Sequence, residues 1–262
     1  MRSDASAGER TVVVTGGSRG IGAATCRLAA AAGWAVAVNY TRDAAAADAV
    51  VAAILQAGGR ALAVRADVAS DAEVRAMFEA VDRKLPPLAG LVNNAGVVDV
   101  AARVDAIAVE RLQRMFAINV FGSFYCAREA IVRMTTKPAS AGAPGLHAGG
   151  AIVNVSSAAA KLGGSGQYVD YAAAKGAIET FTIGLAKEVA GEGVRVNAVR
   201  PGIIDTEIHA SGGAAGRAQQ MAPQVPLQRP GTSDEVAEAI VWLLSERSSY
   251  TTGSIVEVTG GR

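Results

Sequence analysis

The sequence predicts an α/β fold in which a single doubly wound, parallel β-sheet carries helices on both faces. Two observations lead to this prediction. Short apolar runs alternate with longer helical stretches from end to end of the chain, and apolar strands separated by helices are typical of a parallel sheet that is covered on both sides. The first apolar run is followed by a glycine-rich turn and an alanine-rich helical stretch, which is the order of elements in a phosphate-binding unit.

Seven segments are predicted to be the strands, because each is a short apolar run set between helical stretches. In chain order they are Thr11–Thr15, Val36–Asn39, Ala61–Val64, Gly90–Val92, Ala151–Val155, Val194–Val199 and Ile255–Val258. No repeat or linker divides the chain, and 262 residues with 50% hydrophobic content are enough for one α/β core. We therefore expect residues 1–262 to form one domain that carries both the cofactor and the substrate site, with 1–9 as a flexible tail.

The composition argues against several classes of function. The net charge is +1 and the basic residues are dispersed, so no strong field points to nucleic acid or to a membrane surface. Residues 1–9 are polar and unlike a secretory signal, and no apolar run approaches the about 20 residues that span a bilayer. Cys26 and Cys126 are interpreted as buried residues in a reducing compartment, and the two histidines are isolated, so no metal site is expected. We therefore expect a soluble cytoplasmic protein.

The glycine-rich turn is Gly16-Gly17-Ser18-Arg19-Gly20-Ile21-Gly22. Its glycines allow a tight turn and a close backbone approach, and the following helix presents free N–H groups and a partial positive charge to a pyrophosphate. The strand and the helix that flank the turn supply the context that a lone glycine motif lacks. The sequence therefore predicts a phosphate site, with the glycine spacing G-x-x-x-G-x-G and not the G-x-G-x-x-G of the common dinucleotide fingerprint.

Tyr171 and Lys175 are four residues apart in a stretch that reads as the start of a helix. This spacing puts the phenol and the ammonium on one helix face, about 5–6 Å apart at Cβ. At an effective dielectric constant of about 20, a unit charge about 4 Å away is worth up to about 4 kcal/mol, or roughly three pKa units. We therefore expect Lys175 to lower the pKa of Tyr171 and to make it a proton donor and acceptor near neutral pH.

Further motifs follow in a fixed order: Asp67-Val68, Asn93-Asn94-Ala95-Gly96, Asn119, Ser157 and Arg200-Pro201-Gly202. With the glycine turn and the Tyr171/Lys175 pair, they resemble the motifs of the short-chain dehydrogenase/reductase family over nearly the whole chain, from about Arg10 to Arg262. The nearest matches resemble 3-oxoacyl-thioester reductases and glucose dehydrogenases. The resemblance implies a Rossmann-like fold and the reduction of a carbonyl to a secondary alcohol, or the reverse reaction.

The resemblance implies a catalytic set of Asn119, Ser157, Tyr171 and Lys175. Tyr171 would supply the proton, and Ser157 would hydrogen-bond the carbonyl oxygen as charge develops on it. Lys175 would also hold the nicotinamide ribose, and Asn119 would position a water that relays protons to Lys175. The alternative for Asn119 is a residue that kinks or caps a helix.

The residues expected at the cofactor come from the same motifs and from the end of the second strand. They are Gly16, Ser18, Arg19, Gly20, Ile21, Gly22, Asn39, Tyr40, Thr41, Arg42, Asp67, Val68, Asn94, Ala95, Gly96, Tyr171, Lys175, Pro201, Gly202, Ile204 and Thr206.

The choice of cofactor is read at the end of the second strand, where NAD-binding proteins carry an acid for the ribose 2′-OH. The expected acidic position is occupied by Tyr40, and Asp43 is expected to cap the next helix. Arg19 and Arg42 can instead pair with a 2′-phosphate. We therefore expect NADP(H) to be preferred, with NAD(H) as the alternative.

Ser157 precedes Tyr171 by fourteen residues, one more than the family usually has. We attribute the difference to one extra residue in the Gly163–Asp170 loop and expect Ser156 to be structural, because neighbouring side chains on a strand point to opposite faces. Tyr168 is not expected to be catalytic, since Ala172 stands where its lysine would be.

Two loops and the oligomeric state complete the predictions. Lys137–Gly150 is interpreted as a solvated surface loop, and the glycine-rich 211–217 segment as a lid over the substrate. Helices around Asn119–Thr135 and Tyr171–Gly191 are rich in small and apolar residues. By resemblance they would pair across a two-fold axis, with Ile255–Gly261 as a second contact in a homotetramer.

Two other functions compete with a carbonyl reductase. One is a sugar-type NAD(P) dehydrogenase, and the other is a catalytically idle dinucleotide-binding protein with a regulatory role. The second would be supported by loss of the serine, tyrosine or lysine, and all three are present. The sequence does not choose among an acyl thioester, a sugar and a small ketone as the substrate.

Overall fold

The structure, a computed structural model, describes residues 10–137, 149–207, 213 and 216–262. Within this part of the chain seven parallel strands form one sheet in the order β3-β2-β1-β4-β5-β6-β7. The strands are β1 Thr11–Val14, β2 Ala35–Tyr40, β3 Arg60–Arg65, β4 Leu88–Asn93, β5 Gly150–Val155, β6 Val194–Pro201 and β7 Ile255–Val258.

The strands alternate with helices of very different lengths. The helices are α1 Gly20–Ala31, α2 Ala44–Gln56, α3 Asp71–Lys84, α4 Val109–Phe116, α5 Gly122–Met134, α6 Ala159–Leu162, α7 Val169–Val189, α9 Arg217–Met221 and α10 Ser233–Leu244. Shorter turns are the π-helical η2 Ala117–Phe121 and the 3₁₀ segments η1 Val104–Ala106, η3 Ala190–Glu192, η4 Ala222–Gln224 and η5 Glu246–Ser248.

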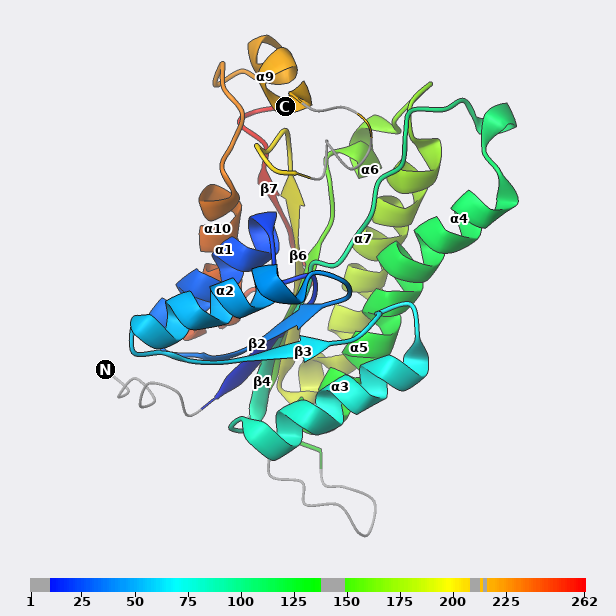
Figure 1. The fold of residues 1–262 in the computed structure, drawn as a ribbon. Coiled ribbons are helices and arrows are strands. Elements are labelled where there is room, and N and C mark those ends of the chain that lie inside the picture. Colours follow the sequence, from blue (N-terminus) through cyan, green and yellow to red (C-terminus); the bar gives the residue numbers. More distant parts are fainter. Residues whose placement is uncertain (1–9, 138–148, 208–212, 214–215) are drawn as a thin grey trace.

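The sheet is covered by helices on both sides (Figure 1). Helices α1, α2 and α10 lie on one face, and α3, α5 and α7 lie on the other. Each face has its own buried core, one around Val12, Val36 and Ile240 and the other around Phe78, Leu91 and Ile152. A sheet buried on both faces needs continuous apolar strands, and this is why the strand segments read as unbroken apolar runs.

The strand order reverses between β1 and β4, which are direct neighbours in the sheet. The chain winds outward from β1 to β3 on one side and from β4 to β7 on the other. In open α/β sheets this reversal leaves a crevice at the carboxyl ends of the strands, where ligands bind. Figure 1 places α6 and α9 at that same end of the sheet.

The predicted doubly wound sheet is confirmed, and all seven strands lie where the apolar runs predicted them. The bounds of β7 are as predicted, and those of the other strands differ from the prediction by at most two residues at either end. The capping role of Asp43 is also confirmed, because its carboxylate accepts a 2.9 Å hydrogen bond from Ala46 N in the first turn of α2. The predicted tail, 1–9, lies outside the described residues.

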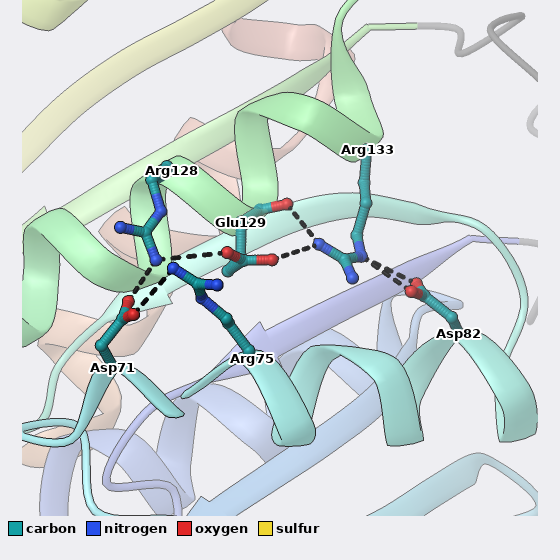
Figure 2. Close-up of polar contacts among 6 residues, drawn as sticks. All are labelled: Asp71, Arg75, Asp82, Arg128, Glu129 and Arg133. Atoms are coloured by element: carbon teal, nitrogen blue, oxygen red, sulfur yellow. Dashed lines mark hydrogen bonds and ion pairs between the residues drawn. The ribbon is translucent and has the colours of Figure 1, made fainter. Parts of the chain in front are cut away.

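Helices α3 and α5 are joined by a network of charged side chains, which Figure 2 shows. Arg133 on α5 donates to Asp82 on α3 at 2.8 Å and to Glu129 at 2.9 Å. At the other end, Arg128 pairs with Asp71, and its hydrogen bond lowers the pKa of that carboxyl. The network is mostly exposed, so each pair contributes modestly. It holds α5 in place, and α5 continues directly from the π-helical turn that carries Asn119.

One continuous helix, Val109–Met134, is long and apolar enough by composition to cross a membrane. The sequence prediction missed it, because α4, η2 and α5 run together as a single 26-residue helix and no single apolar run reveals this. Of its most apolar window 44% is buried inside the protein, and α5 packs on β4 and α3. This burial is typical of a core helix.

Candidate active site

The carboxyl ends of the central strands border a cavity of about 280 Å³. Residues from α1, from the loops after β4, β5 and β6, and from α7 line it. The residues predicted from the sequence that the structure brings together here are Ile21, Asn94, Gly96, Ser157, Tyr171, Lys175, Pro201, Gly202, Ile204 and Thr206. Segments that are far apart in the chain therefore meet at the crevice that the strand order creates.

Tyr171 lies in the first turn of α7 and lines this cavity. Burial raises the pKa of its phenol, a hydrogen bond with the Ser157 side chain opposes that shift, and the neighbouring Tyr168 adds to it. The phenol therefore keeps its proton at neutral pH. A protonated phenol that lines the same cavity as a serine hydroxyl is suited to donate a proton to an oxygen that binds between them.

Lys175 follows one turn later on α7 and is buried. Its Nζ lies 5.7 Å from the centroid of the Tyr171 ring and donates a 2.7 Å hydrogen bond to the carbonyl of Val155 at the end of β5. Burial lowers the pKa of Lys175 to about 8. The predicted sharing of one helix face by the phenol and the ammonium is thus present.

The expected electrostatic effect of this pair is not found. We expected Lys175 to lower the pKa of Tyr171, but the pKa of Tyr171 is raised. The physical reason is that α7 buries both groups, and loss of hydration disfavours the charged form of each. The hydrogen bond from Nζ also goes to the Val155 carbonyl. In this structure Ser157 is the group that lowers the phenol pKa.

Asn119 lies in the π-helical turn η2, between α4 and α5. Its amide is buried and bridges the turn to the loop after β4: Nδ2 donates to Val97 O and Met115 O, both at 3.0 Å, and Oδ1 accepts from Val97 N at 3.2 Å. A Cβ on Gly96 would lie 2.7 Å from Asn119 Oδ1 and 3.5 Å from Lys175 Nζ. Asn119 therefore lies in a distorted part of a helix and also close to Lys175. A role in kinking the helix and a role in the catalytic set are compatible. Single π-turns of this kind are frequent at functional sites.

Ser156 has a different role from Ser157. It is buried just beyond the end of β5, and its hydroxyl donates a 2.7 Å hydrogen bond to Glu179 on α7. Glu179 also accepts two 2.7 Å hydrogen bonds from Arg200, the residue before the Pro201-Gly202 turn. This bond to Glu179 raises the pKa of Arg200. The structural role predicted for Ser156 agrees with these contacts, although Ser156 follows the strand instead of lying within it.

The sequence analysis missed Glu179 and Arg200 as positioning residues. Together with Ser156 they join the serine loop, the Pro201-Gly202 turn and the helix that carries Tyr171. One sequence feature could have indicated the role of Glu179: it lies four residues beyond Lys175 and so shares its helix face. Its partners, on β6 and after β5, were not readable from local spacing.

A second missed pair supports Tyr171 from the other side. Arg111 on α4 makes a two-pronged contact with Asp170, the residue before Tyr171, at 2.7 and 3.1 Å. Arg111 also donates a 2.7 Å hydrogen bond to Val100 O. The Asp170 side chain is fully buried, so removal of Arg111 would leave a buried charge without its partner. This pair fixes the start of α7 against α4.

The glycine turn places the N-terminus of α1 at the crevice. Asp43, Ser70 and Thr232 cap α2, α3 and α10 with their side chains, whereas Arg19 at the start of α1 makes no capping hydrogen bond. The first N–H groups of α1 thus lack a side-chain partner, as expected of a phosphate-binding helix end. Gly22 allows the turn to close, because a Cβ there would lie 2.2 Å from Gly16 O.

Thr15 and Asn94 hold this turn against the end of β4. The Thr15 hydroxyl accepts 2.9 Å hydrogen bonds from the backbone N–H of Asn94 and of Ala95, and Asn94 Nδ2 donates to Thr15 O at 2.9 Å. β1 therefore ends at Val14, one residue before the predicted end. Thr15 was not among the predicted site residues. The sequence feature that could have indicated its role is its position directly before the glycine-rich turn.

Two predicted cofactor residues turn their side chains inward. Asn39 is buried, accepts from Gly16 N at 3.2 Å and donates to Ala66 O at 3.0 Å. Val68 is buried against Gly122, where a Cβ would lie 2.8 Å from its Cγ2. That Asn39 and Val68 contact a cofactor stays a prediction. Asn39 supports the glycine turn from beneath, and Val68 is part of the core.

The end of β2 carries no free acid within the described residues. Tyr40 is half-buried, and Thr41 and Arg42 are exposed. The nearby Asp43 carboxylate is engaged in capping α2. Arg19 is exposed and lies 3.2 Å from Glu207, also exposed, and such a surface pair is weak. Asp67 is at the end of β3, where its Oδ1 accepts from Ala69 N at 2.9 Å.

The proposed lid and the 137–150 loop lie largely outside the described residues. Thr206 lines the cavity just before the undescribed part of the lid, and Arg217 lines it just after. Within the described chain no group of three or more histidine, cysteine or acidic residues could hold a metal ion.

Known proteins resemble this chain over almost its full length. The family described as enoyl-(acyl carrier protein) reductase matches residues 16–262. An uncharacterized oxidoreductase, YgfF of Escherichia coli (strain K12), is 52% identical and covers 95% of this chain and 98% of its own. A 3-oxoacyl-[acyl-carrier-protein] reductase from Synechocystis is 38% identical and covers 96% of each chain.

Solved structures agree with this assignment. A short-chain dehydrogenase from Burkholderia cenocepacia J2315, determined in complex with NADP, superposes with a TM-score of 0.87 at 30% identity and covers 98% of this chain and 99% of its own. The chain therefore belongs to the short-chain dehydrogenase/reductase family, whose members act with NAD(P) on CH–OH groups, which they oxidise, or on the corresponding carbonyls, which they reduce.

Proposed function

We propose that this protein is an NADPH-dependent reductase that converts a carbonyl to a secondary alcohol, or catalyses the reverse reaction, with Tyr171 as the general acid and base. The observation that carries the proposal is the single cavity at the carboxyl ends of the strands that Ser157, Tyr171, Lys175, Pro201 and Gly202 all line. A bound nicotinamide would supply the hydride. Ser157 and Tyr171 would hydrogen-bond the carbonyl oxygen, and Tyr171 would give its proton to that oxygen as negative charge develops.

Lys175 and Asn119 would complete the proton path. The Lys175 pKa of about 8 leaves the ammonium largely charged at neutral pH, so it can stabilise a phenolate that has just lost its proton. Asn119 lies next to it across Gly96. In our proposal Asn119 holds the geometry by which a proton returns to Lys175 from solvent. One domain would carry this site together with the cofactor site.

The proposed cofactor is NADP(H), with NAD(H) as the alternative. Support comes from the end of β2, where Tyr40 stands at the expected acidic position and Asp43 is engaged as a helix cap. The complex of the B. cenocepacia relative with NADP agrees with this choice. Arg19 would exchange its weak contact with Glu207 for the 2′-phosphate, since a charge-assisted bond to a phosphate is stronger than an exposed ion pair.

The cofactor preference gives a direct test. We expect kcat/KM with NADPH to exceed that with NADH by about 10²-fold, because Arg19 and Arg42 would each contribute a bond of about 1.5–3 kcal/mol, near the low end for exposed groups. The Arg19→Ala, Arg42→Ala double variant should lose most of this preference. Adding Tyr40→Asp should reverse it, since a carboxylate repels the phosphate and accepts a bond from the free ribose hydroxyl.

Arg27→Ala provides the matched control for this test, because Arg27 is exposed on the same helix as the glycine turn but is not among the predicted site residues. It removes a positive charge and should leave the NADPH to NADH ratio unchanged. A wild-type ratio below one would refute the assignment of NADP(H). Loss of turnover with both cofactors in the double variant would instead show that these arginines are needed for the reaction itself and not only for the choice of cofactor.

A test for the reaction itself is turnover of a panel of ketones, sugars and acyl thioesters with NADPH. We expect at least one of these carbonyls to be reduced to its secondary alcohol. The sugar-dehydrogenase alternative predicts activity confined to sugars in the oxidative direction. The idle-protein alternative predicts cofactor binding without turnover of any member of the panel.

The proposed assembly is a cytoplasmic homotetramer. Apolar side chains are exposed on the helices predicted to pair: Phe124 on α5 stacks on Phe181 of α7 with ring centroids 3.8 Å apart, and Phe124 remains 45% exposed. Val132 and Ile183 are also exposed on these two helices. At the other proposed contact, near β7, Trp242 and Tyr250 are exposed. Closed symmetric pairing would bury such surfaces.

Light scattering at micromolar concentration tests the assembly. We expect a mass near four chains for the wild type and a smaller species for Phe124→Asp, because a carboxylate in an apolar interface would lose its hydration without a partner. Glu110→Asp on α4 serves as the conservative control and should keep the wild-type mass. A monomeric wild type would show that these exposed apolar residues have another role.

A further inference from the structure

Two arginines line the candidate active-site cavity in addition to the residues that carry the chemistry. They are Arg217, at the start of α9, and Arg262. Within the described part of the chain neither of them forms an ion pair with a carboxylate, whereas Arg103, Arg200 and Arg229 do. Proton transfer and hydride transfer, as proposed above, use neither Arg217 nor Arg262.

Arg217 is held in place by two contacts. Its Nη2 donates a 2.8 Å hydrogen bond to Gln167 Oε1, and its guanidinium carbon lies 5.3 Å from the centroid of the Tyr168 ring. The Tyr168 ring in turn meets Tyr171 edge to face, with centroids 6.5 Å apart. The guanidinium is therefore fixed one aromatic ring away from the proposed proton donor. The distance from the guanidinium carbon to the centroid of the Tyr171 ring therefore cannot exceed the sum of the 5.3 Å and 6.5 Å distances.

Asp99 is the one residue with a carboxylate side chain among the described residues that line the cavity, and it lies 3.7 Å from Arg114 and accepts a hydrogen bond from Val100 N. Lys175 is a further cation at the cavity, because its ammonium donates only to a neutral group, the Val155 carbonyl. The remaining charge at the cavity is therefore positive. Apolar residues such as Leu162 and Ile203 share the lining, and low-polarity walls strengthen the attraction of a cation for an anion.

We infer that Arg217 recognises an anionic group on the substrate, so that the carbonyl compound reduced at this site is an oxo acid. The inference rests on the proposed function and names its substrate class. A carboxylate is the smallest group that matches the two-pronged donor geometry of a guanidinium. The carbonyl would bind at Ser157 and Tyr171, and the carboxylate would reach Arg217 past Tyr168, with Arg262 as a second cation at the same cavity.

The test compares straight-chain oxo acids of increasing length with their methyl esters, using NADPH. The esters keep the carbonyl and the chain but lose the charge. We expect kcat/KM for the best acid to exceed that for its ester by about 10- to 100-fold, as a charge-assisted contact predicts, and the ratio to fall as salt is added. Arg217→Met should bring the ratio close to one, mainly through KM for the acid, while Arg217→Lys should keep part of it.

Arg83→Met is the matched control, because it removes one cation from the exposed face of α3, away from the cavity. It should leave the ratio unchanged. Calorimetric binding of the acid and the ester to the protein with NADP⁺ separates this inference from the proposed function. Binding that favours the acid without any turnover would refute the reductase and support the anion site. Equal binding of acid and ester, no binding of either, or a wild-type ratio near one would overturn the inference.

Discussion

Tyr171→Phe is expected to lower kcat by about 10²- to 10⁴-fold, the contribution of a general acid in the transition state. The substitution removes only the hydroxyl, so the Tyr171 ring can keep its place beside Tyr168 and Lys175. The dissociation constant for NADPH should change little, because the phenol contributes the transferred proton and little of the binding energy of the cofactor. Initial rates and equilibrium binding of NADPH, measured on the same preparations, check both parts.

The neighbouring tyrosine provides the control for this change. Tyr168 lines the same cavity and is also an aromatic residue at the start of α7, but Ala172 stands four residues after it. Tyr168→Phe keeps the ring and should change kcat by a few-fold at most. If Tyr168→Phe lost as much activity as Tyr171→Phe, or if Tyr171→Phe stayed within a few-fold of the wild type, the assignment of the proton donor would be wrong.

The pH dependence of the reduction is a second readout of the same assignment. Burial raises the pKa of Tyr171, so the phenol keeps the proton that it must donate throughout the neutral range. Burial lowers the pKa of Lys175 to about 8, so the ammonium is lost as the pH rises through that value. The kcat/KM for carbonyl reduction should therefore be level near neutral pH and fall above about 8. A rise with pH would contradict the protonated phenol as the active form.

Ser157→Ala is expected to lower kcat by about 10²- to 10³-fold, as for removal of one hydrogen-bond donor that stabilises a developing oxyanion. The reason is the place of the hydroxyl, which lines the same cavity as the Tyr171 phenol. The loss should fall mainly on kcat, because the hydrogen bond strengthens as charge develops on the carbonyl oxygen. Steady-state kinetics with one carbonyl substrate measures the effect.

Ser156→Ala is the matched variant one residue earlier. It removes a buried hydroxyl that donates to Glu179, so it should lower the melting temperature through the loss of a buried hydrogen bond of about 1 kcal/mol. Its effect on kcat should be smaller than that of Ser157→Ala. A larger loss of kcat for Ser156→Ala would show that Ser156, and not Ser157, is the catalytic serine. The explanation of the serine-to-tyrosine spacing by one extra residue in the Gly163–Asp170 loop would then be wrong.

The missed pairs show how the proposed catalytic residues depend on distant parts of the chain. Glu179 links Ser156 to Arg200, and Asp170 links Tyr171 to Arg111. The carboxylates in both pairs lie on α7, within nine residues of Tyr171 in the sequence, and both arginines come from other elements. The Tyr171 and Lys175 pair was therefore readable from local spacing, and Asn119 and Ser157 from the family resemblance, whereas the residues that hold this region in place were readable from neither.

The sequence by itself determined the features that rest on local pattern. Seven apolar runs predicted seven strands, the alanine-rich run after the glycine turn predicted a helix, and the spacing of Tyr171 and Lys175 predicted a shared helix face. These predictions hold because strand periodicity, glycine conformation and the i, i+4 geometry depend on neighbours within a few residues.

Only the tertiary structure decided which side chains face the cavity and what charge they carry. It turned Asn39 and Val68 into the interior, placed Arg217 beside Tyr168, and raised the pKa of Tyr171 where local charge alone predicted a fall. Burial and hydration are summed over segments far apart in the chain, and desolvation of a phenol can exceed the effect of a cation one helical turn away. The spacing in the sequence shows that a cation lies one helical turn from the phenol, but it does not show how far the phenol is buried.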